Sequence, residues 1–362
     1  MKPTQKLHQA GQSLWLDNIT RELLTTGALR SYIDDLGITG LTSNPTIFDH
    51  AFSSSDAYDD AIREAAEEGL APEHVFFRLA IEDLQGAADL FRPIWDRTNG
   101  IDGWVSLEVS PRLARDPDST LAAAVDLSGR AGRPNLFIKI PGTPEGLDAI
   151  EEAIFAGVPV NVTLLFSREQ YLAAAGAYMR GVERRVEAGL DAAVGSVASV
   201  FVSRWDTSPE AKARPERERN ALGIAQAKLS YAAYRELLAS PRWGRLANEG
   251  AQPQRLLWAS TGTKDPEASD VLYVRALAAP LTVNTMPEKT LLAFGDHGEV
   301  SDFLPADGGD AQRVTDRFTA DGVDLEALAE RLQAEGAAAF VTSWDELLQT
   351  IEERSAALAG RR

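Results

Sequence analysis

The chain has 362 residues, of which 44% are hydrophobic and 25% charged, the composition of an ordinary globular protein. It contains no cysteine, which excludes disulfides, thiolate metal sites and a cysteine nucleophile. Its net charge of −18 argues against general binding to nucleic acid or to anionic membranes. An anionic substrate must therefore be bound by a local positive site that acts against the overall field.

No targeting or cofactor signal stands out. The first residues lack the apolar stretch of a secretory signal, and no apolar run is long enough to span a bilayer. We therefore expect a cytoplasmic protein and treat the glycosylation patterns at Asn18 and Asn161 as chance matches. The four histidines show no metal-ligand spacing, and neither a P-loop nor a Gly-x-Gly-x-x-Gly motif after a strand is present.

Short apolar runs alternate with helical patterns along the chain. The runs, which predict strands, are residues 14–16, 38–42, 104–107, 136–138, 158–163, 197–201, 256–260 and 281–284. Helices are predicted at 23–33, 56–68, 72–95, 119–129, 144–157, 168–186, 221–239, 269–277, from about 287, and at 312–318, 325–334 and 344–358. We expect Thr143 to cap the helix after the fourth run, with Pro144 in its first position, and Ser167 and Gln170 to form a capping box.

Two segments fall outside this alternation. Residues 206–220 are rich in charge and proline and are predicted to be an exposed insertion. Residues 308–362 are predicted to be an additional helical tail, so that 1–362 form a single domain. The apolar positions of the tail are expected to pack on the rest of the chain or on the partner subunit of a homodimer.

Eight strands alternating with helices predict an α/β fold of the (β/α)₈ barrel type, with a doubly wound open sheet as the competitor. Polar residues at or just past the ends of the runs favour the barrel, because those ends converge on one mouth where active sites lie. These residues are Asp17, Asn44, Glu108, Lys139, Thr163, Arg204 and Ser260.

Lys139 is the most unusual of them, because it follows a run that reads as a strand buried on both faces. Burial favours the neutral amine, which is a nucleophile and forms a Schiff base with a carbonyl. The alternative is a lysine that extends its charged head into water. An imine at this position would act as an electron sink, so that the bond between the carbons α and β to it could break or form.

That chemistry needs a proton acceptor for the β-hydroxyl and a water that makes and hydrolyses the imine. Asp17 and Glu108 could serve in either role, and Thr163 could hold the water with one of them. Each of the three could instead be a helix cap or a surface group.

Taken together, these residues resemble the transaldolase family in its longer bacterial form. The matching motifs, in the family's order, are LD (16–17), GLTSNP (40–45), VSLEVSPRL (105–113), LFIKIP (136–141), VNVTLLFS (160–167), SVFVSR (199–204) and WAS (258–260). The resemblance implies a class I aldolase mechanism, sugar phosphate substrates and no metal or organic cofactor. It further implies transfer of a dihydroxyacetone unit from sedoheptulose 7-phosphate to glyceraldehyde 3-phosphate in the pentose phosphate pathway.

The resemblance also assigns roles. Lys139 would form the Schiff base, Asp17 would act as the general acid and base, and Glu108 with Thr163 would position the water. Thr42, Asn44 and Asn161 would hold hydroxyls of the donor. Ser199, Phe201, Arg204 and Ser260 would bind the rest of the sugar phosphate. Arg204 suits phosphate because its planar guanidinium binds oxygens in pairs.

One position departs from the shorter members of this family, which carry a second phosphate-binding arginine two residues after the serine matched by Ser260. Here that position is Gly262, and the nearest cation is Lys264. Lys264 is expected to replace the arginine, and the alternative is a lysine that faces solvent.

Two other functions stay open from the sequence. A fructose 6-phosphate aldolase-like enzyme would release dihydroxyacetone instead of transferring it, and Glu108 favours the transaldolase over this alternative. A catalytically silent sugar-phosphate-binding protein would not need a lysine and two carboxylates at strand ends.

Overall fold

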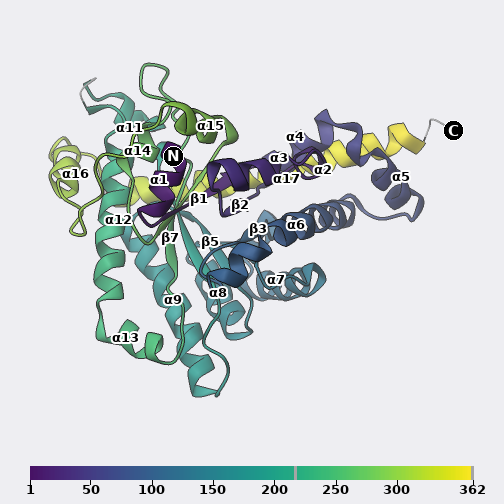
Figure 1. The fold of residues 1–362 in the computed structure, drawn as a ribbon, viewed down its shortest axis with the longest axis horizontal. Helices are drawn as coiled ribbons and strands as arrows, with labels where there is room; N and C mark the ends of the chain where they lie inside the picture. Colours follow the sequence, from purple (N-terminus) through teal and green to yellow (C-terminus); the bar gives the residue numbers. More distant parts are fainter. Residues whose placement is uncertain (216–217, 360–362) are drawn as a thin grey trace.

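Eight parallel strands form the centre of the computed structural model, which describes residues 1–215 and 218–359 (Figure 1). The strand order is β2-β1-β8-β7-β6-β5-β4-β3. The outer strands, β2 (Gly40–Thr42) and β3 (Val105–Glu108), meet through a bridge between Gly40 and Trp104, and the Leu41 N–H donates to the Trp104 carbonyl at 3.0 Å. The sheet is therefore closed into a (β/α)₈ barrel, as predicted, and is not a doubly wound open sheet.

Gly40 permits this closure. A Cβ at this position would lie 2.5 Å from the Trp104 carbonyl oxygen and 2.8 Å from the Trp15 ring. The two strands can approach only because glycine has no side chain.

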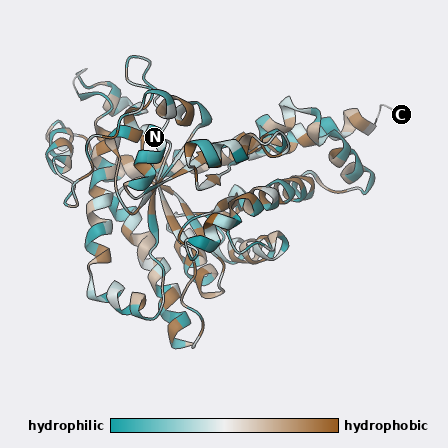
Figure 2. Ribbon diagram, in the orientation of Figure 1, coloured by the Kyte–Doolittle hydropathy of each residue, from teal (hydrophilic) through white to brown (hydrophobic). Residues whose placement is uncertain are grey.

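The other strands lie close to the predicted runs: β1 (Gln12–Asp17), β4 (Leu136–Pro141), β5 (Val160–Leu165), β6 (Ser196–Phe201), β7 (Arg255–Ala259) and β8 (Thr282–Met286). Nearly every strand residue is buried, as expected for parallel strands covered by helices outside and by one another inside. Figure 2 shows hydrophobic residues gathered in these central strands. The strand β4 differs from the prediction, because it continues through Pro141 and leaves Lys139 inside the strand rather than at its end.

The helices surround this barrel. Their bounds are α1 (Pro3–Gln9), α2 (Arg21–Thr25), α3 (Ala28–Ser31), α4 (Pro45–Ser54), α5 (Asp59–Glu67), α6 (Pro72–Arg97), α7 (Pro117–Ala131), α8 (Gly146–Phe155), α9 (Arg168–Glu187), α10 (Ser203–Thr207), α11 (Pro209–Lys212), α12 (Leu222–Leu238), α13 (Pro241–Asn248), α14 (Leu272–Ala276), α15 (Glu288–His297), α16 (Ala311–Ala320) and α17 (Leu325–Ala359). None of the helices in the described ranges is long and apolar enough to cross a membrane.

Capping explains where two of these helices begin. The predicted capping box at the start of α9 is confirmed, since the Gln170 N–H donates to the Ser167 hydroxyl and the Gln170 side chain accepts from the Ser167 N–H. Helix α8 begins later than predicted. The Thr143 hydroxyl accepts from the Gly146 N–H, so Thr143 and Pro144 belong to the turn before the helix.

The carboxyl-terminal tail contains one long helix where two were predicted. The helix α17 runs without a break through residues 335–343, where Ala337, Ala338 and Ala339 favour the helix despite Gly336. It lies beside α4 and α5 (Figure 1), and the Trp344 ring packs edge-on against Phe76 of α6 with ring centroids 4.9 Å apart.

The segment 206–220 is not uniformly exposed, contrary to the prediction. Asp206, Ser208 and Ala211 are buried where α10 and α11 pack on the barrel, and positions 216 and 217 of the predicted insertion lie outside the described residues. The Asp206 carboxylate accepts from the Tyr273 hydroxyl at 2.9 Å and from the Gly223 N–H at 3.1 Å. These two donors fix the buried start of the segment.

Asp206→Asn is expected to reduce the loss of stability that the protein undergoes as the pH rises. Burial raises the pKa of Asp206 from 3.8 to about 6, so the folded state holds this proton more tightly than the unfolded state. Stability from this group is complete below about pH 4 and is lost as the pH rises through 6, which costs the wild type about 1–2 kcal/mol between pH 5 and pH 8. Urea unfolding at both pH values measures the difference. The control Asp118→Asn removes an exposed charge and should retain the wild-type difference, and an Asp206→Asn protein that also retains it would contradict the assignment.

Candidate active site

A cavity of about 390 Å³ lies at the carboxyl ends of the strands, where a barrel of this type carries its active site. All the predicted site residues line it except Glu108 and Asn161, which are buried next to cavity residues. The lining comprises Asp17, Thr42, Asn44, Thr46, Ile47, Lys139, Thr163, Ser199, Phe201, Arg204, Ala259, Ser260, Gly262, Lys264, Thr285, Pro287 and Phe340. The barrel thus brings together residues that are far apart in the sequence.

Lys139 and Glu108 form a buried pair at this site. They are register partners on the adjacent strands β4 and β3, and the Lys139 Nζ lies 3.2 Å from the Glu108 Oε2 and donates to the Ser43 carbonyl at 3.3 Å. The two side chains are 7% and 4% exposed, which excludes the alternative of a lysine whose head lies in water. Burial raises the pKa of Glu108, and the Lys139 ammonium only partly opposes this shift.

Two buried oxygens near this pair are unpaired. The Glu108 Oε1 and the Thr163 hydroxyl have no hydrogen-bond partner among the described residues. Buried polar atoms are normally paired, so each unpaired atom needs a partner such as a water or a ligand group. Both oxygens belong to residues that were predicted to hold a water.

Asp17 accepts a hydrogen bond at the end of β1. The Thr42 hydroxyl, on the register partner strand β2, donates to the Asp17 Oδ1 at 2.7 Å. The Thr285 hydroxyl lies 2.7 Å from that of Thr42 and donates to it, since the single Thr42 proton points to Asp17. Burial raises the pKa of Asp17, while the Thr42 hydrogen bond and the charges of Lys139 and Lys264 lower it in part. Asp17 is therefore a stronger base than an exposed aspartate.

Asn161 is held by its neighbours inside the barrel. Its carboxamide oxygen accepts from the Ser199 hydroxyl at 2.7 Å, and its nitrogen donates to the Ser106 hydroxyl at 3.1 Å. Asn44 lines the cavity and also caps α4, because its side-chain oxygen accepts from the Ile47 N–H at 3.1 Å. The predicted hydroxyl-binding asparagines are thus fixed in place by the fold.

Arg204 supplies a half-buried positive charge of the kind that an anionic substrate requires. Within the described ranges its guanidinium forms no ion pair, and it lies 5.4 Å from the centroid of the Phe201 ring. Burial lowers the pKa of Arg204, and the charge of Glu335 partly opposes this change. The Ser260 hydroxyl lies 2.9 Å from that of Ser203, and the exposed Lys264 completes the lining. This part of the cavity can bind a phosphate.

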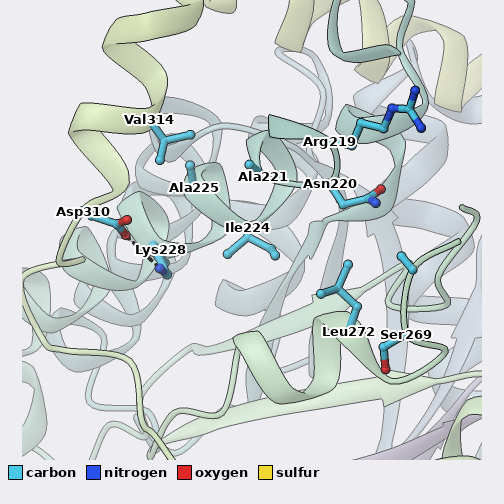
Figure 3. A pocket seen from close by; sticks show the side chains of 11 residues that line it. Arg219, Asn220, Ala221, Ile224, Ala225, Lys228, Ser269, Leu272, Asp310 and Val314 are labelled. Atoms are coloured by element: carbon cyan, nitrogen blue, oxygen red, sulfur yellow. Dashed lines mark hydrogen bonds and ion pairs between the residues drawn. The ribbon is translucent and has the colours of Figure 1, made fainter. Parts of the chain in front are cut away.

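Other hollows lack this set of residues. The one in Figure 3 has a volume of about 410 Å³ and lies between α12, the loop before α14 and α16. Its Lys228 is paired with Asp310 at 3.0 Å, and none of the predicted site residues lines it. In the part of the chain that the structure describes, no cluster of three histidine or carboxylate side chains could hold a metal ion.

Several lining residues were not predicted, and two of them, Thr285 and Phe340, lie next to predicted site residues. Thr285 lies one position beyond the predicted run 281–284, so the rule that polar residues at run ends face the mouth could have identified it. Phe340 belongs to α17, and no sequence pattern connects this tail residue with the barrel.

The comparisons with known proteins agree with this geometry. The family model described as transaldolase/fructose-6-phosphate aldolase matches residues 14–351. A protein named transaldolase from Thermobifida fusca is 46% identical over 363 residues, which cover 98% of this chain and 99% of that protein. The transaldolase of Saccharopolyspora erythraea is 46% identical with 97% of each chain covered, and that of Frankia alni is 44% identical with the same coverage.

Proposed function

The chain belongs to the transaldolase/fructose-6-phosphate aldolase family, and from this premise we propose how its residues carry out the transaldolase reaction. The enzyme moves a dihydroxyacetone unit from sedoheptulose 7-phosphate to glyceraldehyde 3-phosphate, and the products are erythrose 4-phosphate and fructose 6-phosphate. The observation that carries the mechanism is the buried Lys139 amine, which is paired with Glu108 and lines the same cavity as Asp17.

In the first half of the reaction, the Lys139 amine attacks the C2 carbonyl of the donor, and loss of water gives a protonated imine. The Asp17 carboxylate then takes the proton of the C4 hydroxyl, the C3–C4 bond breaks, and its electron pair moves into the imine to form an enamine. The raised pKa of Asp17 makes it a better base for this step. The aldose released from sedoheptulose 7-phosphate is erythrose 4-phosphate.

In the second half, the enamine carbon attacks the aldehyde of glyceraldehyde 3-phosphate, and Asp17 returns its proton to the new hydroxyl. Water then adds to C2, the C–N bond breaks, and fructose 6-phosphate leaves. We assign this water to Glu108 and Thr163, because each has a buried oxygen without another partner in the described chain. The Glu108 carboxyl can pass protons to and from the water, since its Oε2 already contacts the amine.

We assign the sugar phosphate to the remaining lining residues and to Asn161, which is buried beside them. Arg204 would bind the phosphate, with Ser260 and Lys264 beside it, and Phe201 would form the wall next to Arg204. Thr42, Asn44 and Asn161 would bind donor hydroxyls, and Ser199 would support Asn161 through its hydrogen bond. The proposed substrates are charged and do not cross a bilayer unaided, so we expect the enzyme to work in the cytoplasm.

Lys264→Ala is expected to raise the Michaelis constant for phosphorylated substrates about threefold to tenfold with little change in kcat, because a point charge that binds the phosphate is lost. Steady-state kinetics with glyceraldehyde 3-phosphate as the acceptor measures the change. Lys212→Ala removes an exposed charge outside the cavity and is the matched control. An unchanged Michaelis constant in Lys264→Ala would mean that Lys264 faces solvent only.

The aldolase-like alternative differs in the fate of the three-carbon unit. The test supplies fructose 6-phosphate with and without erythrose 4-phosphate and follows sedoheptulose 7-phosphate and free dihydroxyacetone by NMR. A transaldolase forms sedoheptulose 7-phosphate when the acceptor is present and releases little dihydroxyacetone without it. Release that is as fast as transfer would favour the aldolase, and binding of fructose 6-phosphate in calorimetry without either product would favour the silent binding protein.

A further inference from the structure

The middle of α17 closes one side of the active-site cavity. The Gln333 side chain donates to the carbonyl oxygens of Gly142 at 3.0 Å and Leu164 at 2.9 Å. Gly142 directly follows β4, and Leu164 lies near the end of β5. One turn further along the helix, a Cβ at Gly336 would lie 2.9 Å from Leu164 Cδ2 and 3.1 Å from Arg204 Nη1. The glycine thus allows the helix to lie directly against the proposed phosphate-binding arginine.

Phe340 follows on the same face of the helix, four residues after Gly336. Its ring lines the cavity and is almost buried, at 8% exposure. The centroid of the ring lies 5.3 Å from the Lys139 Nζ. Phe340, a residue of the tail, therefore forms part of the cavity wall beside the amine at which the proposed chemistry takes place.

Two properties of the ring matter for a covalent intermediate on Lys139. An aromatic face attracts a cation within about 6 Å of its centroid, so the ring favours the charged, protonated imine. A phenylalanine side chain also fills space that water would otherwise occupy beside the imine. The second effect acts while the dihydroxyacetone unit waits on the enzyme as a neutral enamine. The attraction for a cation acts only on the protonated imines that precede and follow the enamine.

At that stage two reactions compete. In transfer, the enamine carbon forms a bond with the acceptor aldehyde carbon. In hydrolysis, the enamine is protonated, water adds to C2, and the C–N bond breaks to give free dihydroxyacetone and the lysine amine. We propose that Phe340 determines the preference for transfer over hydrolysis. It does so by excluding water from the side of the intermediate that faces α17, so that transfer is faster than release of dihydroxyacetone. This inference rests on the transaldolase mechanism proposed above.

The experiment compares wild type with Phe340→Ala and Phe340→Leu and measures dihydroxyacetone released per unit transferred, with fructose 6-phosphate as donor and erythrose 4-phosphate as acceptor. The ratio is expected to rise about tenfold in Phe340→Ala. It should rise less in Phe340→Leu, which keeps most of the bulk without the aromatic face. Phe340→Leu decides the question if Phe340→Ala does not fold, and its ratio must then still exceed that of the wild type.

Leu347→Ala is the matched control. Leu347 lies on the same face of α17, seven residues further on, and is fully buried without lining the cavity. The Leu347→Ala substitution loosens the packing of the helix. A rise in its release ratio equal to that of Phe340→Ala would assign the effect to helix docking and overturn the role of the ring. A wild-type ratio in both Phe340 variants would also overturn it. Failure of the wild type to transfer at all would instead count against the proposed function.

Discussion

Lys139→Ala is expected to lower transfer by roughly 10⁴-fold or more, the scale on which removal of a nucleophile acts in enzymes that form covalent intermediates. The physical reason is that the imine and its electron sink both need a primary amine inside the cavity. Lys264, the other lysine of the lining, is exposed and is assigned to phosphate. Borohydride reduction with fructose 6-phosphate, followed by intact mass and peptide mapping, should give a dihydroxyacetone-sized adduct on Lys139 in the wild type and none in the variant.

A control must show that the Lys139→Ala variant is folded, because an unfolded protein would also lose transfer. Removal of Lys139 leaves the Glu108 carboxyl buried without its partner, and breaking a buried pair costs roughly 3–5 kcal/mol. Lys139→Ala combined with Glu108→Gln removes this charge, and circular dichroism checks that both variants are folded. Adduct formation in a folded Lys139 variant, or substantial residual transfer, would contradict the mechanism.

Asp17→Asn is expected to lower transfer by roughly 10²–10⁴-fold, the contribution typical of a general base. The variant keeps the Lys139 amine, so the imine still forms, but no group takes the C4 hydroxyl proton and the C3–C4 bond stays intact. Borohydride trapping with fructose 6-phosphate should therefore give an adduct of the size of the whole fructose 6-phosphate molecule. A dihydroxyacetone-sized adduct in this variant would assign the base to another residue.

The pH dependence offers an independent check on Asp17. Its carboxylate is the active form, so kcat/KM of the wild type should fall as the pH drops through a pKa that burial places above the usual 3.8. Thr42→Val serves as the control because it removes the hydrogen bond that lowers the pKa of Asp17. The acidic fall in activity should then move to higher pH, and an unmoved profile would mean that another group controls it.

The barrel and most of its site were predictable because strand ends obey a general rule. Buried parallel strands appear as continuous apolar runs, and the polar residue that ends a run points into the mouth, as Asp17 does. The rule works one strand at a time and needs no knowledge of neighbours. It placed the end of β4 too early, since Pro141 is the last residue of the strand and pairs in register with Thr163 on β5.

Contacts between distant segments could not be predicted in this way. The middle of α17 carries no strong periodic pattern that would place it against the barrel, and the charges of residues 206–220 predict exposure although Asp206 is buried. In each case the deciding partner, Arg204 beside Gly336 or Tyr273 beside Asp206, is more than sixty residues away in the chain.

The sequence by itself determined the class of fold, the family and the lysine on which the proposed chemistry depends, because these follow from local periodicity and from short motifs. Only the tertiary structure decided that Lys139 is paired with Glu108 out of water, that the Thr285 hydroxyl pairs with that of Thr42, and that Phe340 lies over the amine. The reason is that pairing, burial and the resulting pKa shifts are properties of neighbours in space, and barrel closure and the docking of α17 create those neighbours.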